Sequence, residues 1–504
     1  MSAARPARES SSTWRATAVR AGVCGFIFFY YWTLLSDGKF FAVEPVRYGL
    51  TFNSMIDYLA RLRFDIDPSI ILHEGFLRDG HTYSYFGVTP ALLRLPLLIL
   101  PRFAGVDFTV ISCAVAASIA AIAQLAAVRR ARLAMGDVPY AGRITALAMA
   151  IFIFGGPQLQ FLRPSVFQEA LNWASAIAAI FVAMAFRWCI DVPGRQPRHL
   201  TAMATLAGLC LLTRVSTSIG LYAACGGIML PGVVAALGKN GGRAAILATF
   251  RMVLSPLLIL LLWAAICATV NYQRWASPLT FQDYKYYNSL LPDDPVFTVL
   301  NNYGYFNFRR IPFALSYFFV PVWAIIGSDG HFLFRAPQDR LFYIIELPPA
   351  TFLASDPLLC FIACLGAGWL WRGQSAWIDA AAARLAAIGL ALPGLLMLMA
   401  IAITFRYRME FYPFFEFLAL FGLFGLARRF AARPRSLTRI CATMAVISIV
   451  SAHAFLLAYK VGPWGDSVEV EQTGWVDAYR RYFHFKYPAI ADRIDRTEAL
   501  PPAH

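Results

Sequence analysis

Residues 18–48 read AVRAGVCGFIFFYYWTLLSDGKFFAVEPVRY, an apolar run that ends abruptly in polar sequence. A transmembrane helix needs about 20 mostly apolar residues, and the run up to Ser36 supplies them. Arg15 precedes the run and Arg20 stands near its start, and no small-residue cleavage site follows it. We therefore expect a retained first transmembrane helix, with a long polar loop beginning at Asp37.

The rest of the chain repeats this pattern of apolar runs. Of its 504 residues 59% are hydrophobic and 14% are charged, whereas soluble domains carry about 25% charged residues. The composition predicts an all-α polytopic membrane protein. Eleven transmembrane helices are predicted, at residues 18–36, 107–128, 142–157, 168–187, 200–213, 217–237, 252–271, 355–371, 384–405, 412–427 and 440–459.

Lys and Arg collect in alternate loops, which the positive-inside rule assigns to the cytoplasm. The amino terminus is then cytoplasmic, and the carboxy terminus and two long polar loops, 37–106 and 272–354, are extracytoplasmic. The net charge of +15 follows this topology and does not indicate nucleic-acid binding. Basic side chains of the cytoplasmic loops include Arg129, Arg130, Arg132, Arg195, Arg198, Lys239, Arg243, Arg372, Arg428, Arg429, Arg433 and Arg435.

The domain organisation follows from the same count. Residues 1–459 are expected to form one membrane domain, and residues 460–504 an extracytoplasmic tail. Two apolar stretches inside the loops, 88–103 and 311–327, are read as interfacial helices on the outer face. Counting either as a span would move the following Arg clusters to the outside.

Five segments follow one another in a recognisable order. An acid comes soon after the first helix, then an acidic stretch, a Gly-His-x-Tyr-Ser stretch, a Pro- and Leu-rich interfacial helix and a late Arg-Tyr segment, at residues 43–48, 63–67, 79–84, 89–96 and 405–413. This layout resembles the C-type (GT-C fold) glycosyltransferases of the cell envelope, in their protein-mannosyltransferase-like branch. The resemblance implies inverting transfer of a hexosyl or pentosyl unit from a polyprenyl-phosphate donor to a lipid, glycan or protein acceptor, in a bacterial inner membrane.

Such a transfer needs a carboxylate that accepts the proton of the attacking hydroxyl. Glu44 occupies the position of the family's acid after the first helix, although many members carry an Asp-Glu pair where this chain has Val43 and Glu44. Asp37 and Asp57 are the alternative catalytic residues. Each of these acids has a second reading, as a solvated loop carboxylate or as the partner of Arg47 or Arg61 in an ion pair.

The leaving group would be a lipid phosphate, which Arg can hold through two parallel hydrogen bonds. For the Arg residues near the membrane, snorkelling to the interface is the other reading. Tyrosines of the second loop either stack on a sugar or belong to an interfacial belt. The candidate substrate-binding residues are Arg47, His81, Tyr83, Arg94, Arg214, Arg406 and Arg408, and the tyrosines are Tyr284, Tyr286, Tyr287, Tyr303 and Tyr305.

No cofactor is predicted, because no GxxxxGK[ST] or GxGxxG motif is present to bind a nucleotide. A divalent metal is a minor alternative near His73 and His81, whose spacing is not that of a metal site. A lipid or sugar transporter, or flippase, without chemistry is the rival function. Residues 213–218, between two spans, are the region that would suit a transporter. A non-catalytic envelope-assembly subunit also stays open.

Overall fold

The computed structural model describes residues 7–43, 45–100, 102–238, 242–288, 294–320, 340–345, 350–372, 378–432 and 434–461. Every predicted span coincides with a helix, and the all-α polytopic membrane fold is confirmed. The helices are α1 (Ala7–Leu35), α5 (Thr109–Met135), α6 (Ala141–Phe154), α8 (Val166–Ile190), α9 (Pro197–Leu211), α10 (Val215–Leu237), α11 (Arg243–Trp275), α17 (Pro357–Arg372), α18 (Ala380–Met399), α19 (Tyr412–Ala432) and α20 (Pro434–Val461).

Within the described ranges, nine helices are long and apolar enough to cross a membrane. The chain is thus an integral membrane protein. The other two predicted spans are shorter, since α9 has 15 residues and α17 has 16. At 1.5 Å per residue they rise about 22 and 24 Å, less than the hydrocarbon core of about 30 Å. α9 packs on α10 and α11, and α17 packs on α19.

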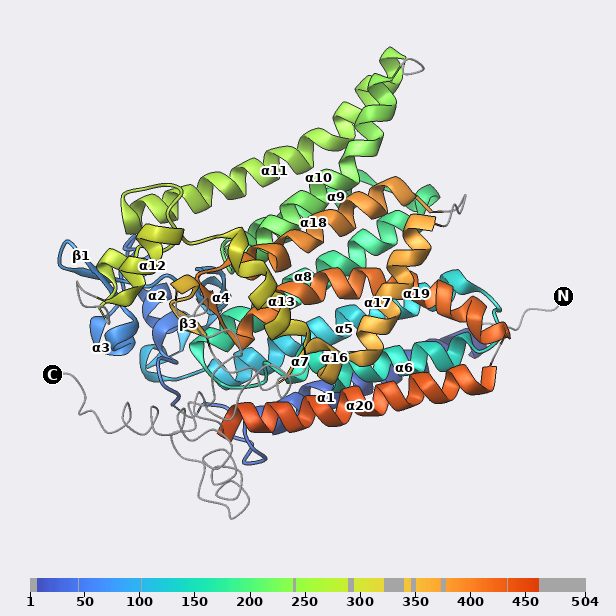
Figure 1. Cartoon of the computed structure of the whole chain (residues 1–504), viewed down its shortest axis with the longest axis horizontal. Helices are drawn as coiled ribbons and strands as arrows, with labels where there is room; N and C mark the ends of the chain where they lie inside the picture. Colours follow the sequence, from blue (N-terminus) through green and yellow to red (C-terminus); the bar gives the residue numbers. More distant parts are fainter. Residues whose placement is uncertain are drawn as a thin grey trace.

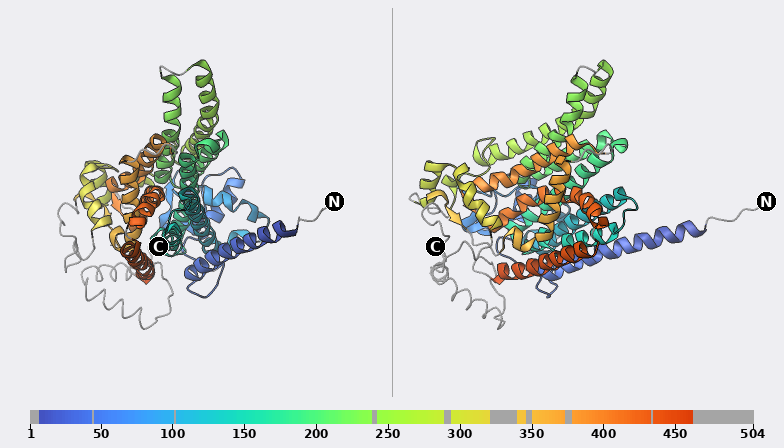
Figure 2. Two further views of the ribbon diagram at one scale, coloured as in Figure 1. Left: turned by 90° about the vertical axis from the view of Figure 1, so that its right-hand side faces the viewer. Right: turned by 45° about the vertical axis from the view of Figure 1, so that its right-hand side comes forward.

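Neighbouring helices run in alternating directions, so the connections fall at two ends of the bundle (Figure 1). The two long loops lie together at one end, and the amino terminus lies at the other. α10 and α11 extend beyond the remaining helices as a pair (Figure 2). α5 begins directly after the first long loop, so Arg129, Arg130 and Arg132 near its other end lie opposite to the long loops.

The first long loop is built from short elements. They are α2 (Thr51–Ala60), α3 (Pro68–Ile71), η1 (Leu72–Glu74), β1 (Phe76–Arg78), β2 (His81–Tyr83), α4 (Thr89–Leu93), η2 (Leu95–Ile99) and η3 (Phe103–Gly105). Pro90 and Pro96 stand at the starts of α4 and η2, so the stretch 88–103 is broken and does not span. Leu92, Leu93 and Ile99 are exposed on it, as expected for an interfacial segment.

The second loop and the segment before α19 add η5 (Tyr284–Tyr286), α12 (Pro295–Tyr303), η6 (Phe308–Arg310), α13 (Ile311–Phe319), β3 (Ile344–Ile345), α16 (Phe352–Ser355), β4 (Ala402–Ile403) and η7 (Phe405–Phe411). The short elements α7 (Gly156–Leu159) and η4 (Val192–Gly194) flank α8. α13 has nine residues, too few to cross a membrane. The remainder of the predicted interfacial stretch, from residue 321, and the tail from residue 462 lie outside the described residues.

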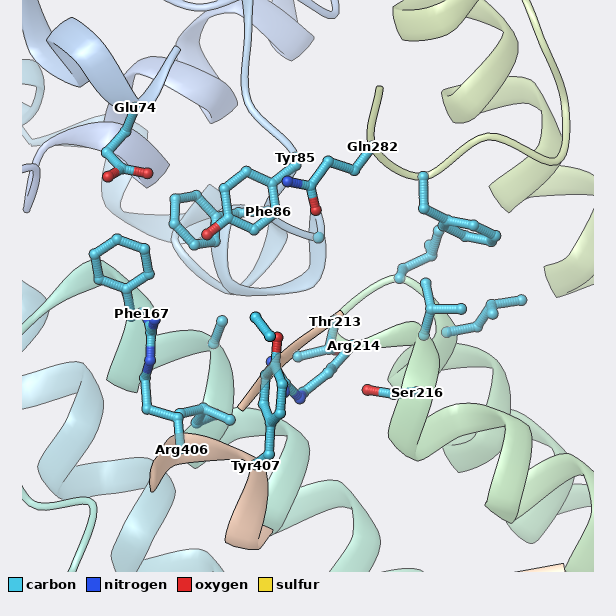
Figure 3. A pocket seen from close by; sticks show the side chains of 18 of the residues that line it. Glu74, Tyr85, Phe86, Phe167, Thr213, Arg214, Ser216, Gln282, Arg406 and Tyr407 are labelled. Carbon is cyan, nitrogen blue, oxygen red and sulfur yellow. The ribbon is translucent and has the colours of Figure 1, made fainter. Parts of the chain in front are cut away.

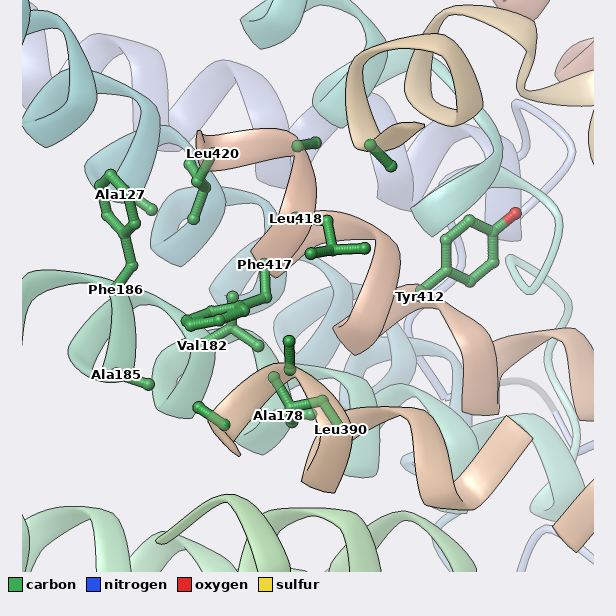
Figure 4. Close-up of a cluster of buried hydrophobic side chains, with 14 of the residues drawn as sticks. Ala127, Ala178, Val182, Ala185, Phe186, Leu390, Tyr412, Phe417, Leu418 and Leu420 are labelled. Carbon is green, nitrogen blue, oxygen red and sulfur yellow. The ribbon is translucent and has the colours of Figure 1, made fainter. Parts of the chain in front are cut away.

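The largest apolar core lies between α8, α18 and α19 (Figure 4). Phe186 packs edge-on against Phe421, with ring centroids 5.1 Å apart. α17 and α19 approach so closely that a Cβ on Gly366 would lie 1.8 Å from the carbonyl oxygen of Leu418. This packing fixes the start of α19, and η7 leads directly into it.

Candidate active site

A cavity of about 470 Å³ opens where the two long loops meet the ends of the helices (Figure 3). This volume suits a small-molecule site. Both loops, the turn between α9 and α10, the end of α11 and η7 all contribute to its wall. The polar and aromatic lining residues are Glu74, Tyr85, Phe86, Phe167, Thr213, Arg214, Ser216, Asn271, Arg274, Gln282, Tyr284, Tyr287, Tyr343, Thr404, Arg406 and Tyr407.

The β1–β2 hairpin brings the first loop to the cavity. Asp79 and Gly80 form its turn with positive φ angles of 53° and 77°, which an Asp-Gly pair adopts readily. Phe76 on β1 is fully buried, with its ring centroid 5.4 Å from that of Trp275 and 4.8 Å from that of Tyr287. The hairpin is therefore held between α11 and the second loop, and Glu74 precedes it directly.

The segment after the hairpin lies directly on the turn between α9 and α10. A Cβ on Gly87 would stand 2.2 Å from the carbonyl oxygen of Leu212, so only glycine permits this approach. The backbone N–H of Thr89 donates to the same carbonyl oxygen at 3.0 Å. The contact fixes the turn that carries Arg214.

Two of the predicted phosphate-binding residues, Arg214 and Arg406, line the cavity. The Arg406 guanidinium lies 4.5 Å from the ring centroid of Phe167, and the Arg214 guanidinium lies 5.9 Å from that of Tyr407. In Figure 3 the side chains of Glu74 and Tyr85 project from the first loop toward those of Arg406 and Tyr407.

Arg274, at the end of α11, is a third cation of the cavity wall, and the sequence analysis missed it. Its side chain is buried. Its Nη1 donates to the carbonyl oxygen of Phe86 at 2.8 Å and its Nη2 contacts the sulfur of Met55 at 3.6 Å. Its Nε has no hydrogen-bond partner among the described residues, and no carboxylate pairs with it there. An Arg at the outer end of an apolar run is a signal that points to a site, because such a charge is costly.

Glu74 is the second residue that the sequence analysis did not select. Its carboxylate lines the cavity and forms no hydrogen bond or ion pair within the described part of the chain. Burial, followed by the charge of Glu74, raises the pKa of Tyr85 well above its ordinary value. The hydroxyl of Thr404, which also lines the cavity, is buried and has no partner in the described ranges.

Tyrosines of the second loop form an aromatic wall. Tyr284 and Tyr287 line the cavity, and the ring of Tyr284 stacks on that of Tyr305 at a centroid distance of 5.9 Å. Burial raises the pKa of Tyr284 above its ordinary value. The rings of Tyr284 and Tyr287 offer flat faces to a ligand.

Arg94 and Arg408, also predicted to bind substrate, do not line the cavity. Arg94 donates to both carboxylate oxygens of Glu169, at 2.7 and 2.6 Å. Arg408 donates to Asp356 at 2.8 Å and to Ser355 at 2.6 Å. The prediction failed for these two because each guanidinium is committed to a buried carboxylate, which ties the loops to the bundle.

The predicted residues of the first loop also lie away from the cavity. The Arg47 guanidinium stacks over its neighbour Tyr48, at 5.0 Å from the ring centroid. The Nδ1 of His81 lies 3.0 Å from Asp65, and the Tyr83 ring packs near Trp275. Burial raises the pKa of Asp65, but hydrogen bonds from Arg63 and His81 hold this pKa below its ordinary value.

The three predicted catalytic acids are not brought together. Asp37 accepts a hydrogen bond from the Nζ of Lys460 at 2.7 Å, and Asp57 pairs with Arg61 at 2.9 Å on an exposed helix face. Neither lines the cavity. Glu44 lies outside the described residues. In the described ranges, no group of three or more His, Cys, Asp or Glu side chains is arranged to hold a metal ion.

Compared by sequence, the chain matches no family model and no curated protein. Solved structures with a similar course of the chain include the archaeal oligosaccharyltransferase AglB from Archaeoglobus fulgidus in complex with an inhibitory peptide and a dolichol-phosphate. It is 14% identical, with a TM-score of 0.47 over 94% of this chain and 60% of that chain. The same enzyme in complex with Zn and sulfate is 12% identical, with a TM-score of 0.47 over 96% and 58%.

ArnT from Cupriavidus metallidurans bound to undecaprenyl phosphate is 14% identical, with a TM-score of 0.40 over 94% of this chain and 74% of that chain. The chain thus spans about 60% of the length of the oligosaccharyltransferase chains. With every TM-score below 0.5, these neighbours describe the course of the chain and leave activity to be argued from the cavity.

Proposed function

We propose that this chain is a membrane glycosyltransferase that moves a sugar, with inversion, from a polyprenyl-phosphate carrier to the hydroxyl of an acceptor at the extracytoplasmic face. One observation carries the proposal: the cavity joins three arginines and an aromatic wall to Glu74, a carboxylate without a partner among the described residues. The hexosyl or pentosyl nature of the sugar, the acceptor and a bacterial inner membrane with the amino terminus inside remain parts of the proposal.

The cations support binding of a lipid phosphate. Arg274 is buried in the last turn of α11, with no carboxylate partner in the described part of the chain, and a buried charge is costly unless it is compensated. A phosphate would supply the missing charge and an acceptor for its Nε. Arg214 and Arg406 add donors from two further directions, and a guanidinium can meet a phosphate through two parallel hydrogen bonds.

Glu74 is the proposed general base. Its carboxylate accepts the proton of the acceptor hydroxyl as that oxygen bonds to the anomeric carbon. The bond from the anomeric carbon to the carrier phosphate breaks, and its electron pair stays on the phosphate oxygen, facing the arginines. General base catalysis typically contributes about 10²–10⁴-fold to a rate. Glu44, suggested by the family resemblance, is the competing proposal for this role.

The location of the cavity favours transfer chemistry over transport. A transporter is expected to hold its substrate near the middle of the membrane, often on broken helices. This cavity is instead lined by both long loops, at one end of the bundle. The sugar and the lipid phosphate would thus meet at the membrane surface, where a carrier lipid can present its head group from the side.

Native mass spectrometry of gently purified protein tests the proposal. Wild type, Glu74→Gln and Glu44→Gln are compared for co-purified lipid, with Asp57→Asn as a matched carboxylate outside the cavity. We expect bare polyprenyl phosphate on wild type and Asp57→Asn, and the glycosylated carrier retained on Glu74→Gln.

Retention on Glu44→Gln alone would assign the base to Glu44. The same glycosylated lipid on all four proteins would favour a transporter. No polyprenyl lipid on any of them would contradict the proposed function.

A further inference from the structure

We infer that Glu410 is a positioning residue that fixes the Arg214 side chain with its two terminal nitrogens toward the cavity. The inference rests on the proposed function, because it assigns Arg214 to the phosphate. It concerns a fully buried carboxylate that does not itself line the cavity.

Glu410 has both carboxylate oxygens occupied by side chains at the start of α10. Its Oε1 accepts from the Nε of Arg214 and from the hydroxyl of Ser216 at 2.6 Å. Its Oε2 accepts from the hydroxyl of Thr217 at 2.7 Å. Three donors within four positions of the chain thus hold the carboxylate in a single orientation.

The choice of nitrogen atom is what makes this contact a positioning contact. Glu410 takes the Nε of Arg214, and the Nη nitrogens form no hydrogen bond recorded within the described ranges. The Arg214 side chain is 23% exposed, on the cavity wall. The planar fork that matches a phosphate is therefore left for a ligand.

The buried pairs elsewhere use the opposite geometry. In Arg94 and Arg408 the Nη2 binds the carboxylate of Glu169 or Asp356, and the Nη1 donates to Asn53 or to the carbonyl oxygen of Ala350. The protein itself therefore occupies both terminal nitrogens of these guanidinium groups. In Arg214 the contact runs through the Nε, and the terminal nitrogens stay available.

Glu410 also links two parts of the cavity wall. It lies on η7, the same short turn that carries Arg406 and Tyr407, whereas Arg214 belongs to the turn before α10. Through Glu410, the position of the Arg214 fork is set relative to Arg406.

A double-mutant cycle on ligand binding tests the inference. Binding of farnesyl phosphate and of uncharged farnesol is measured for the full chain in detergent, for wild type, Arg214→Gln, Glu410→Gln and the double variant. Hydrogen bonds to charged groups contribute enough that losing the Arg214 contact should weaken farnesyl phosphate binding about tenfold or more. We expect Glu410→Gln to give a similar loss, the double variant to be no weaker than Arg214→Gln, and farnesol binding to be unchanged.

Two further variants guard against a simple folding defect. Ser216→Ala removes one donor to Glu410 and leaves Arg214 intact, so a smaller loss of farnesyl phosphate binding is expected. Glu169→Gln makes the same change in a buried pair away from the cavity, and should lower thermal stability without changing the preference for farnesyl phosphate over farnesol.

Losses from Arg214→Gln and Glu410→Gln that multiply in the double variant would overturn the inference and leave the function standing. A similar loss of farnesol binding in Glu410→Gln would also overturn it, since a structural role alone would explain that result. If wild type binds farnesol as well as farnesyl phosphate, the proposed function fails, and the assignment of Glu410 fails with it.

Discussion

The buried arginines of the bundle and those of the cavity balance their charge in different ways. Arg94 and Arg408 each have a carboxylate within 2.8 Å, from Glu169 and Asp356. Arg310 pairs with no carboxylate among the described residues, but its nitrogens reach four backbone carbonyl oxygens at 2.7–3.0 Å. Arg274 has one carbonyl oxygen and one sulfur. Of these four arginines, Arg274 has the fewest acceptors among the described residues, and it is the one that lines the cavity.

This difference teaches how to separate a binding cation from a structural one. All four residues are buried, so burial does not distinguish them. The count of acceptors around each guanidinium does, because a buried donor without an acceptor costs about 1–3 kcal/mol. The incomplete site is the candidate for function.

Arg94→Met should have the largest effect on stability, because it breaks the buried ion pair between Arg94 and Glu169. It leaves the fully buried Glu169 without its cation, and removing one partner of a buried pair costs about 3–5 kcal/mol. Thermal unfolding in detergent measures the loss. The double variant Arg94→Met/Glu169→Gln should recover much of it, and an unchanged melting temperature in the single variant would abolish the distinction drawn here.

Arg274→Met makes the same substitution on the cavity wall, where we expect no loss of stability. Removing a cation that lacks a carboxylate should leave the stability of the ligand-free protein unchanged or raise it. Farnesyl phosphate binding should fall about tenfold or more, while farnesol binding persists. A melting temperature that drops as in Arg94→Met, with farnesyl phosphate binding intact, would make Arg274 structural.

Gly87→Ala should disturb the cavity and leave the buried ion pairs of Arg94 and Arg408 intact. The added Cβ would stand 2.2 Å from the carbonyl oxygen of Leu212, so the segment must move, at a cost of about 1–3 kcal/mol. The carbonyl oxygen of Phe86, which accepts from Arg274, moves with it. We expect weaker farnesyl phosphate binding, measured beside Gly226→Ala, whose Cβ would meet nothing within 4 Å. Equal binding by the two variants would argue against this coupling.

The sequence predicts the bundle well because each span is a local signal of length and apolarity. It also selects Arg214 and Arg406, since an Arg at the end of a span is costly. Arg94 and Arg408 give the same signal in the sequence, and only the fold separates them. Glu169 lies 75 residues from Arg94, and no local pattern announces that pairing.

The sequence also fails to single out the proposed base, Glu74. Glu74 stands in a loop with many ionisable residues, and nothing in its immediate sequence sets it apart. It reaches the cavity because Phe76, two residues later, is clamped between Trp275 and Tyr287, from α11 and the second loop. Contacts between residues about 200 positions apart select this carboxylate.

Asp65, whose partners Arg63 and His81 are exposed, should show the smallest effect on stability. Hydrogen bonds from Arg63 and His81 keep the pKa of Asp65 below its ordinary value, against the effect of burial. Because the pKa is lower in the folded state, the Asp65 carboxylate stabilises the fold at pH values above its unfolded pKa of about 3.9. This stabilisation is lost as the pH falls through the folded pKa. Because both partners are about half exposed, the contribution should be below about 1 kcal/mol. Thermal unfolding of wild type and Asp65→Asn should thus differ slightly at pH 7 and converge below pH 4, whereas a large difference at pH 7 would class Asp65 with the buried pairs.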